Sequence, residues 1–542
     1  MKIGNLYILL IGLLSLVVAS CEDNPNDWDY DESYLRLFRP TEYEAIELRP
    51  TSVVMRFFGV SDATRYVFEF SEGDSLEFTN IIRTSEIGVD TLTPYDEGES
   101  IVTTEYRVPF GNLKGTTPYS VRMKAVSDTK NMESGYSQVY FVTPDEQIIK
   151  SVTPSVTKAT VIWETGADVT HVVYWKYVSE GEPDKQTMQL TAEQKTEGRA
   201  IIRDLSFGSY VVQIFNNDAK RGESSFTTLG SPGENGVIFK MLAADAEKMN
   251  ENLESAVSGG YKKVSIICME SDNSYDVETI TIPAGIEELY FFGESGDDGT
   301  LPELYLHKVV LSAPMTSIAF RGIDLNARLN SSNYVFSLGD ANYFKTIEFD
   351  GCKIRNIGRC LIRFNHADLN IESVKINNSM IENVGVSGYG FYNFGTDAAN
   401  VGLISITNST IMEFGSDRLM HIKGGVKSIV IDKCILYNNT SKSAEIFRFD
   451  KEPGSVAVTN SIFAGSNGGN KINSGNAAYT YLEFYGCYLT SDFEVKDHAF
   501  TNATLLDITS GELFVNPEKG NFRLKEGVRF AGNGKAGDPR WW

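Results

Sequence analysis

The residues best suited to chemistry recur at a regular spacing in the second half of this chain. Four short segments, LIRFN, FYNFG, LMHIKG and IFRFDK, alternate apolar and polar residues. Their first polar positions are 30, 28 and 27 residues apart, and a second polar position follows each of them two residues later. The first set is Arg363, Asn393, His421 and Arg448, and the second set is Asn365, Gly395, Lys423 and Asp450. Such a set could bind carboxylate or sulfate groups, because guanidinium grips an oxyanion with a fork of donors.

Neighbouring loops could add to this set, and the set also has a simpler interpretation. The loop candidates are His366, Asp368, Tyr389 and Arg418. The alternative is a solvated face in which Asp417 and Asp450 neutralise the cations internally. The chain carries a net charge of -23, which argues against a nucleic-acid partner because such a partner requires a basic face.

A longer repeat explains why the polar residues should share one face. Six segments, from IEFDGCKI to LEFYGCYL, follow the template apolar-x-apolar-x-x-Cys/Ser-x-apolar, with some variation at the last position. The Cys/Ser positions are Cys352, Ser379, Ser409, Cys434, Ser461 and Cys487, at spacings of 27, 30, 25, 27 and 26 residues. A repeat of this length without helices indicates stacked β coils. The small residues lie at a bend and are predicted to form an inward structural ladder, and a catalytic thiol is not expected there.

This repeat resembles the right-handed parallel β-helices of the pectin-lyase type, over residues 231–542. Apolar residues at helical spacing, ended by Gly259-Gly260, predict a capping helix at about 238–258. The ending LFVNPEKGNFRL…GNGKAGDPRWW resembles the last coil of uncharacterised β-helix lipoproteins of bacterial polysaccharide systems. Alternation along the four short segments then places their apolar residues inside the rod and their polar residues outside.

Two small β domains are predicted before the repeat, at residues 34–145 and 146–230. Both show short alternating runs between turn signals, as expected for half-buried strands. The stretch NLKGTTPYSVRMKAV resembles the tyrosine-corner region of fibronectin type III domains, with Tyr119 six residues after Leu113. Tyr210 follows Leu205 at five residues, so the second motif is weaker. The predicted fold class is therefore all-β.

The N-terminus predicts a lipid anchor. Residues 1–20 read as a signal peptide, and the sequence VVASC resembles the lipobox of bacterial lipoproteins, with Cys21 as the lipidated residue. Residues 21–33 are acidic and are predicted to form an extended tether. They resemble the export tag of surface lipoproteins from polysaccharide-utilisation systems. The resemblance implies an outer-membrane protein, anchored by lipid and facing the exterior, with components of a glycan-uptake transporter as partners.

Three functions remain open from the sequence. The first is binding of an acidic, pectin-like, uronate-containing polysaccharide by the outer face of the rod. The second is a polysaccharide lyase, with Arg363, Lys423 or Arg448 as base, His421 as its partner, and Ca²⁺ as the cofactor that many such lyases use. The third, and least supported, is a hydrolase using Asp450 and Asp417. The strand faces carry no Asp cluster at repeat spacing, so no cofactor or metal site is predicted with certainty.

Overall fold

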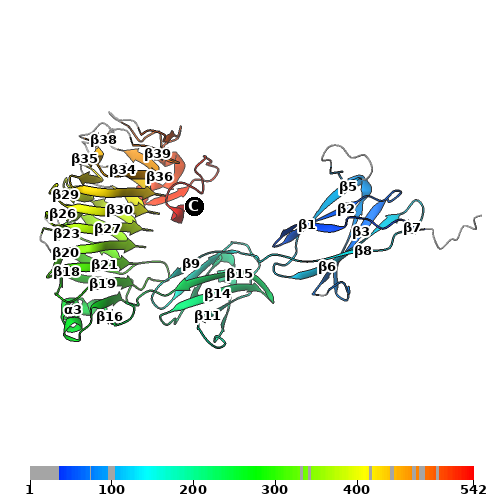
Figure 1. Cartoon of the computed structure of the whole chain (residues 1–542), viewed down its shortest axis with the longest axis horizontal. Helices are drawn as coiled ribbons and strands as arrows, with labels where there is room; N and C mark the ends of the chain where they lie inside the picture. The colour runs from blue at the N-terminus through cyan, green and yellow to red at the C-terminus, as the bar shows by residue number, and fades with distance from the viewer. Residues whose placement is uncertain are drawn as a thin grey trace, which may run out of the picture.

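The chain forms three units in a row: two β-sandwiches followed by a parallel β-solenoid (Figure 1). The computed structural model describes residues 36–73, 75–95, 104–329, 334–339, 343–413, 418–439, 445–466, 471–474, 482–495 and 500–542. Strands make up nearly all of its regular structure, which confirms the predicted all-β class. The predicted signal peptide and tether, including Cys21, lie outside the described residues. Within the described ranges, no helix is long and apolar enough to cross a membrane.

The first sandwich packs two antiparallel sheets, which resemble those of a fibronectin type III domain. Tyr119 is buried, and its hydroxyl accepts a hydrogen bond of 3.0 Å from the backbone N–H of Lys114. This bond ties the preceding loop to β6, as the tyrosine-corner motif predicts. One sheet contains β1 (Glu44–Arg49), β2 (Ser52–Phe58) and β5 (Glu105–Phe110). The other contains β3 (Arg65–Glu72), β4 (Ile81–Gly88), β6 (Pro118–Ser127), β7 (Met132–Glu133) and β8 (Ser137–Val142).

The second sandwich has the same plan around the buried Trp163. The hydroxyl of Tyr210 lies 3.1 Å from the backbone N–H and 3.1 Å from the carbonyl oxygen of Ser206, so the weaker motif also closes its loop. One sheet contains β9 (Ile149–Pro154), β10 (Ala159–Trp163) and β13 (Arg199–Ile202). The other contains β11 (His171–Lys176), β12 (Gln186–Gln189), β14 (Ser209–Asn216) and β15 (Ala219–Thr227), and α2 (Ala192–Glu197) precedes β13.

The solenoid consists of three parallel ladders, and each regular coil contributes one strand to each ladder. The first ladder is β16 (Gly236–Met241), β17 (Lys263–Cys268), β19 (Glu288–Gly293), β21 (Met315–Arg321), β24 (Phe344–Asp350), β27 (Asn370–Asn377), β30 (Asn400–Thr407), β33 (Gly425–Asp432), β36 (Val456–Thr459) and β39 (Phe484–Tyr485). The second ladder is β22 (Asp324–Asn326), β25 (Lys353–Ile357), β28 (Met380–Val384), β31 (Thr410–Met412), β34 (Ile435–Asn439), β37 (Ile462–Ser466), β40 (Tyr488–Leu489) and β41 (Thr504–Leu505). The third ladder is β23 (Tyr334–Leu338), β26 (Cys360–Phe364), β29 (Tyr392–Phe394), β32 (Met420–Ile422), β35 (Glu445–Phe449) and β38 (Lys471–Ser474). The long strand β20 (Glu303–Leu311) joins the second and third ladders and also pairs with β18 (Ser274–Ile282).

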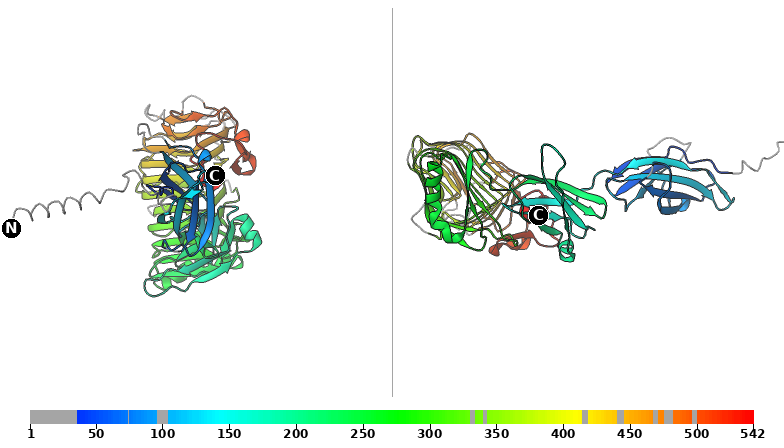
Figure 2. Two further views of the ribbon diagram at one scale, coloured as in Figure 1. Left: turned by 90° about the vertical axis from the view of Figure 1, so that its right-hand side faces the viewer. Right: turned by 90° about the horizontal axis from the view of Figure 1, so that it is seen from below.

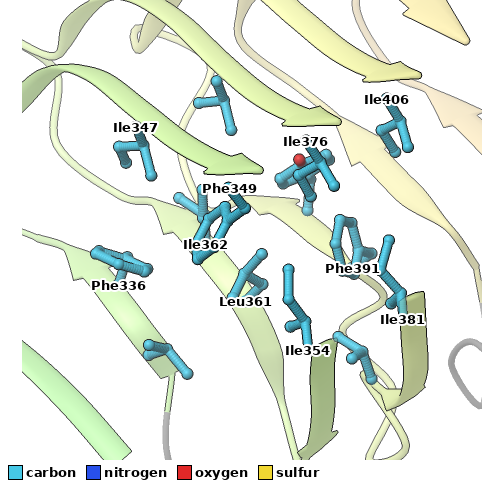
Figure 3. Close-up of a cluster of buried hydrophobic side chains, with 14 of the residues drawn as sticks. Phe336, Ile347, Phe349, Ile354, Leu361, Ile362, Ile376, Ile381, Phe391 and Ile406 are labelled. Carbon is cyan, nitrogen blue, oxygen red and sulfur yellow. The ribbon is translucent and has the colours of Figure 1, made fainter. Parts of the chain in front are cut away.

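Apolar side chains from successive coils fill the interior of the rod (Figure 3). Phe291, Phe320 and Phe349 stack in one column, with ring centroids 4.8 and 5.2 Å apart. One coil cannot bury these rings alone, so each coil depends on its neighbours.

The Cys/Ser positions form the predicted inward ladder at the bend between the first and second ladders. The backbone N–H of Cys352 donates to Oγ of Ser379 at 3.1 Å, and that of Ser379 donates to Oγ of Ser409 at 3.0 Å. The Cys352 thiol donates to the carbonyl oxygen of Phe320 at 3.2 Å, and burial raises its pKa to about 12. Such a thiol stays protonated and packs as a small apolar group, which suits a structural role.

The helical cap is shorter than the sequence predicts. Residues 238–241 belong to β16, which pairs in parallel with β17 and so has its backbone satisfied by the sheet. The helical part is the short turn η3 (Ala243–Lys248) followed by α3 (Met249–Ser258), which buries Met249, Leu253 and Ala256 against the first coils. In the view from below, α3 lies across the end of the coil stack (Figure 2).

A buried carboxylate joins the second sandwich to the solenoid. Oε2 of Glu294, which follows β19, accepts hydrogen bonds of 2.9 Å from the backbone N–H groups of both Val156 and Thr157. Val156 also packs against Ile267 and Phe292 of the solenoid. The two units therefore share a small core and a charge-assisted link.

The C-terminal segment folds back on the outer side of the second ladder. It contains α4 (Ser510–Leu513), β42 (Phe514–Asn516) and β43 (Asn521–Leu524). Its apolar residues pack against Tyr437, Ile462 and Tyr488. The second ladder is thus covered at this end, whereas no described segment is packed in this way over the third ladder.

Candidate functional site: an arginine and tyrosine face on the third ladder

The third ladder stacks the predicted column of polar residues. Arg363 pairs with Asn393, Asn393 with His421, and His421 with Arg448, in consecutive parallel registers. Their apolar neighbours in the same strands are at most 1% exposed and fill the rod. Alternation then sets the four polar side chains on the outer side of the sheet, so the alignment predicted from the sequence is confirmed.

Two arginines and two tyrosines form a cluster at the Arg363 end. The Arg363 guanidinium carbon lies 4.8 Å from the ring centroid of Tyr334 and 5.3 Å from that of Tyr389. Arg359 lies over the same two rings, at 5.2 and 5.5 Å. Both arginines donate to the Tyr334 hydroxyl, Arg359 at 3.2 Å and Arg363 at shorter range. The two rings meet edge to face with centroids 5.5 Å apart, so the four side chains hold one another in place.

A glycine-rich loop carries Tyr389 to this cluster. Gly385, Gly388 and Gly390 have φ angles of +78°, +99° and +74°, which L-residues rarely adopt. A Cβ on Gly390 would lie 2.6 Å from the carbonyl oxygen of Arg418. Glycine is therefore required there for the loop to lie against the next coil.

The cluster carries positive charge that the described residues do not neutralise. In the described ranges neither Arg359 nor Arg363 has a carboxylate within ion-pair distance, and Nε of Arg363 is buried without a hydrogen-bond acceptor. Hydrogen bonds from Tyr334 and Arg363 lower the pKa of Tyr389, whereas burial raises the pKa of Tyr334. Two neighbouring guanidinium groups with phenols as their partners suit an anionic ligand.

A second group of charges surrounds His421. Its Nε2 lies 2.8 Å from Oδ2 of Asp450, and its Nδ1 lies 3.3 Å from Nη1 of Arg418. Nε of Arg448 donates to the other Asp450 oxygen at 2.9 Å. Burial would raise the pKa of Asp450, but the hydrogen bonds from His421 and Arg448 outweigh it, and the pKa is lowered.

The two central members of the predicted column are buried. His421 is 6% exposed and Asn393 is 7% exposed. They lie on the outer side of the sheet, but His421 is flanked by Arg418 and Asp450, whose side chains hydrogen-bond to it. A ligand on this face would meet the arginines before it met the histidine.

The second predicted column continues beyond the strand ends. Backbone hydrogen bonds of 2.8–2.9 Å keep the coil spacing there. They run from the N–H groups of Asn365, Gly395 and Asp450 to the carbonyl oxygens of Leu338, Phe364 and Ile422, respectively. Asn365 and Gly395 are exposed and Lys423 is half-buried. Among the residues that the structure describes, Lys423 has no ion pair.

His366 and Asp368, in the loop after β26, contact each other. Nδ1 of His366 accepts a 3.2 Å hydrogen bond from the backbone N–H of Asp368 and lies 3.8 Å from its carboxylate. The two residues therefore close a local turn beside Asn365. Asp417, the other carboxylate considered for a hydrolase, lies outside the described residues.

Sequence reasoning missed Tyr334 and Arg359. Tyr334 pairs with Cys360 one coil before the predicted column begins. Extending the alignment back to the segment YVFSL would have placed Tyr334 on this ladder. Arg359 precedes β26 at a bend and has no counterpart at repeat spacing, so periodicity could not have found it. In the part of the chain that is described, no three His, Cys, Asp or Glu side chains are grouped so as to hold a metal ion.

The fold and this face define a solenoid protein with a cationic, aromatic surface, carried on two fibronectin type III-like sandwiches. Residues 308–414 match a family described as a domain of unknown function, DUF4957, and residues 429–541 match another, DUF5123. The first match contains Arg359, Arg363 and Tyr389, and the second contains Arg448 and Asp450. No curated protein matches the chain.

Three solved structures are similar to parts of this chain. A two-domain fibronectin type III segment of chicken tenascin is 16% identical, with 35% of this chain and 98% of that chain covered and a TM-score of 0.23. The FN1–FN3 domains of chicken CNTN1 are 17% identical, with coverages of 35% and 66% and a TM-score of 0.17. Astrotactin-2, a vertebrate perforin-like membrane protein, is 20% identical, with coverages of 20% and 22% and a TM-score of 0.17.

Proposed function

We propose that this protein binds an acidic polysaccharide, pectin-like and rich in uronate, on the outer face of the third ladder. The observation that carries the proposal is the pair of guanidinium groups, Arg359 and Arg363, that share two tyrosine rings and have no carboxylate partner in the described ranges. Arginine binds carboxylates through paired donors, and an aromatic ring beside it offers a face to a sugar ring. A uronate residue presents both features.

The spacing of the charges favours a polymer over a small anion. Arg363 and Arg448 are three coil steps apart, which corresponds to about 14 Å along the rod. A single carboxylate can contact only one end of this row. A chain with a carboxylate on each sugar can contact both ends together and gains affinity because the second contact is intramolecular.

The rest of the chain suits display of this face at a cell surface. In this proposal Cys21 is lipidated, the acidic residues 21–33 form a tether, and the two sandwiches are spacers. The solenoid is then held outside the outer membrane, where it captures glycan for the components of an uptake transporter. The buried link at Glu294 would keep the solenoid and the second sandwich in a fixed relation.

A lyase is the second candidate, and Tyr389 is the residue that favours it. Its pKa is lowered by hydrogen bonds from Tyr334 and Arg363, so its phenolate is more accessible than that of an ordinary tyrosine. In a β-elimination this phenolate would take the proton beside the uronate carboxylate while Arg363 neutralises that carboxylate. The C–O bond to the leaving sugar then breaks, Tyr389 returns the proton to the leaving oxygen, and an unsaturated uronide remains.

Affinity electrophoresis through polygalacturonate tests the proposal, with the chain from residue 34 onward as the protein. We expect the polygalacturonate gel to retard the wild type. The Arg359→Ala/Arg363→Ala variant should not be retarded, and a fully methyl-esterified pectin gel should not retard the wild type. Arg321→Ala is the matched control, because Arg321 is a partly exposed arginine of the first ladder. Equal mobility of the wild type with and without polygalacturonate would refute binding.

Absorbance of unsaturated uronides separates the two candidates in the same samples. Product formed by the wild type and lost in Tyr389→Phe would show the lyase. Retardation without product would leave binding as the function.

A further inference from the structure

His421 connects two arginines of consecutive coils through one chain of hydrogen bonds. Arg418 has only donors, so Nδ1 of His421 must accept its bond. The imidazole is then neutral, carries its hydrogen on Nε2, and donates it to Asp450. The second oxygen of Asp450 accepts from Nε of Arg448. The order of the chain is Arg418, His421, Asp450, Arg448.

The surroundings of His421 favour this neutral form. The charged groups that face it in the described ranges are Asp450, Arg418 and Arg448. Burial lowers the pKa of the imidazole, and the two arginines lower it further, against an opposing effect of Asp450. At neutral pH His421 can therefore accept from Arg418 and donate to Asp450 at the same time.

We infer that His421 is a positioning residue, which holds Arg418 directly and Arg448 through Asp450 so that both guanidinium groups face the same polyanion. His421 is 6% exposed and cannot itself cover much of a ligand. Its two ring nitrogens instead fix the directions of side chains that reach the surface, as the outer hydrogen-bond partners of a binding site do. This inference rests on the proposed function, because it assigns His421 a role in the same binding face.

Two substitutions of His421 test the two halves of this hydrogen-bond chain separately. His421→Gln places an amide near Nε2, which preserves a donor to Asp450 and removes the acceptor for Arg418. His421→Asn places an amide near Nδ1, which preserves an acceptor for Arg418 and removes the donor to Asp450. Each variant is combined with Arg418→Ala and with Arg448→Ala, and the dissociation constant for polygalacturonate oligomers is measured at pH 7.5.

The expected pattern is non-additive and different for each variant. His421→Gln should weaken binding about three- to tenfold in the wild-type background, since one hydrogen bond to a charged group is lost. It should have no further effect when Arg418 is already alanine, because it acts through that residue. His421→Asn should show the same behaviour against Arg448→Ala.

Additive losses in both backgrounds would overturn the inference, as would unchanged binding in both single variants. If His421→Gln does not fold, the cycle of His421→Asn with Arg448→Ala decides alone. If Arg359→Ala/Arg363→Ala removes binding and both mutant cycles are additive, the positioning role is overturned and the proposed function stands. Absence of wild-type binding overturns the proposed function, and the inference falls with it.

A spectroscopic readout checks the hydrogen-bond chain without any ligand. Imidazole ¹⁵N shifts of His421 should report a neutral ring protonated at Nε2, and Arg418→Ala should move the Nδ1 signal. A ring protonated at Nδ1, or one unaffected by Arg418→Ala, contradicts the chain.

Discussion

Replacing Gly395 with alanine should damage the binding face while leaving the fold almost unchanged. A Cβ at this position would lie 2.0 Å from Oδ1 of Asn365 and 3.2 Å from Nε of Arg363. Ordinary contact begins at about 3.4 Å, so the amide oxygen must move by about 1.4 Å and the guanidinium by a few tenths. Asn365 is exposed and can rotate into solvent, so the stability cost is small. It is further offset by about 0.4–1 kcal/mol, because alanine restricts the unfolded chain.

The effect on binding should be much larger than the effect on stability. Disturbing one charge-assisted contact of Arg363 costs about 1.5 kcal/mol or more, which is roughly a tenfold rise in the dissociation constant. Calorimetric titration with polygalacturonate oligomers measures this rise, and a thermal scan measures stability. The control is Asn365→Ala/Gly395→Ala, which removes the clash with Asn365 but keeps the Cβ at 3.2 Å from Nε of Arg363, so it should bind as weakly as Gly395→Ala does, whereas Asn365→Ala alone should not. Wild-type affinity in Gly395→Ala, or a drop in the melting temperature of more than about 5 °C, would refute this account.

Three further predictions concern the elements that support this face. Glu294→Ala leaves two backbone N–H groups at the sandwich joint without their acceptor and should cost about 2–5 kcal/mol; chemical denaturation measures it, and Glu294→Gln, which keeps an acceptor oxygen, should recover part of the loss. Burial lowers the pKa of His421 below its ordinary value of 6.5, so its contribution to stability is complete above that value and is lost as the pH falls below it. Urea midpoints at pH 7.5 and 5.5 should therefore differ more for the wild type than for His421→Asn, and equal differences would contradict the assignment. Trp541→Phe removes the indole N–H that donates to Thr410 at 2.9 Å and should cost about 1 kcal/mol; an unchanged thermal midpoint would show that the C-terminal segment is held by packing alone.

The repeat spacing predicted the strand register of the third ladder. It did not predict the positions of side chains that lie outside the repeat. Arg363, Asn393, His421 and Arg448 were placed correctly because their apolar neighbours must enter the rod. The burial of His421 could not be predicted, because it depends on the directions of the Arg418 and Asp450 side chains.

The repeat spacing could not predict the aromatic residues of the site. Tyr389 was found only as a loop neighbour, although its approach depends on three glycines with positive φ. Arg359 precedes its strand, and its place over the two rings follows from a bend that no spacing encodes. The start of the capping helix was placed too early for a related reason: β16 satisfies its backbone through a strand pairing that is not local in sequence.

The central claim is that uncompensated guanidinium groups on the third ladder bind a polyanionic glycan. Its most direct test is the dissociation constant for a polygalacturonate oligomer, measured calorimetrically for the wild type and for Arg359→Ala/Arg363→Ala at low and at physiological ionic strength. We expect saturable binding by the wild type that weakens as salt screens the charges, and loss of most of that affinity in the double variant. Equal affinities in the two proteins, or no binding by the wild type at low salt, would contradict it.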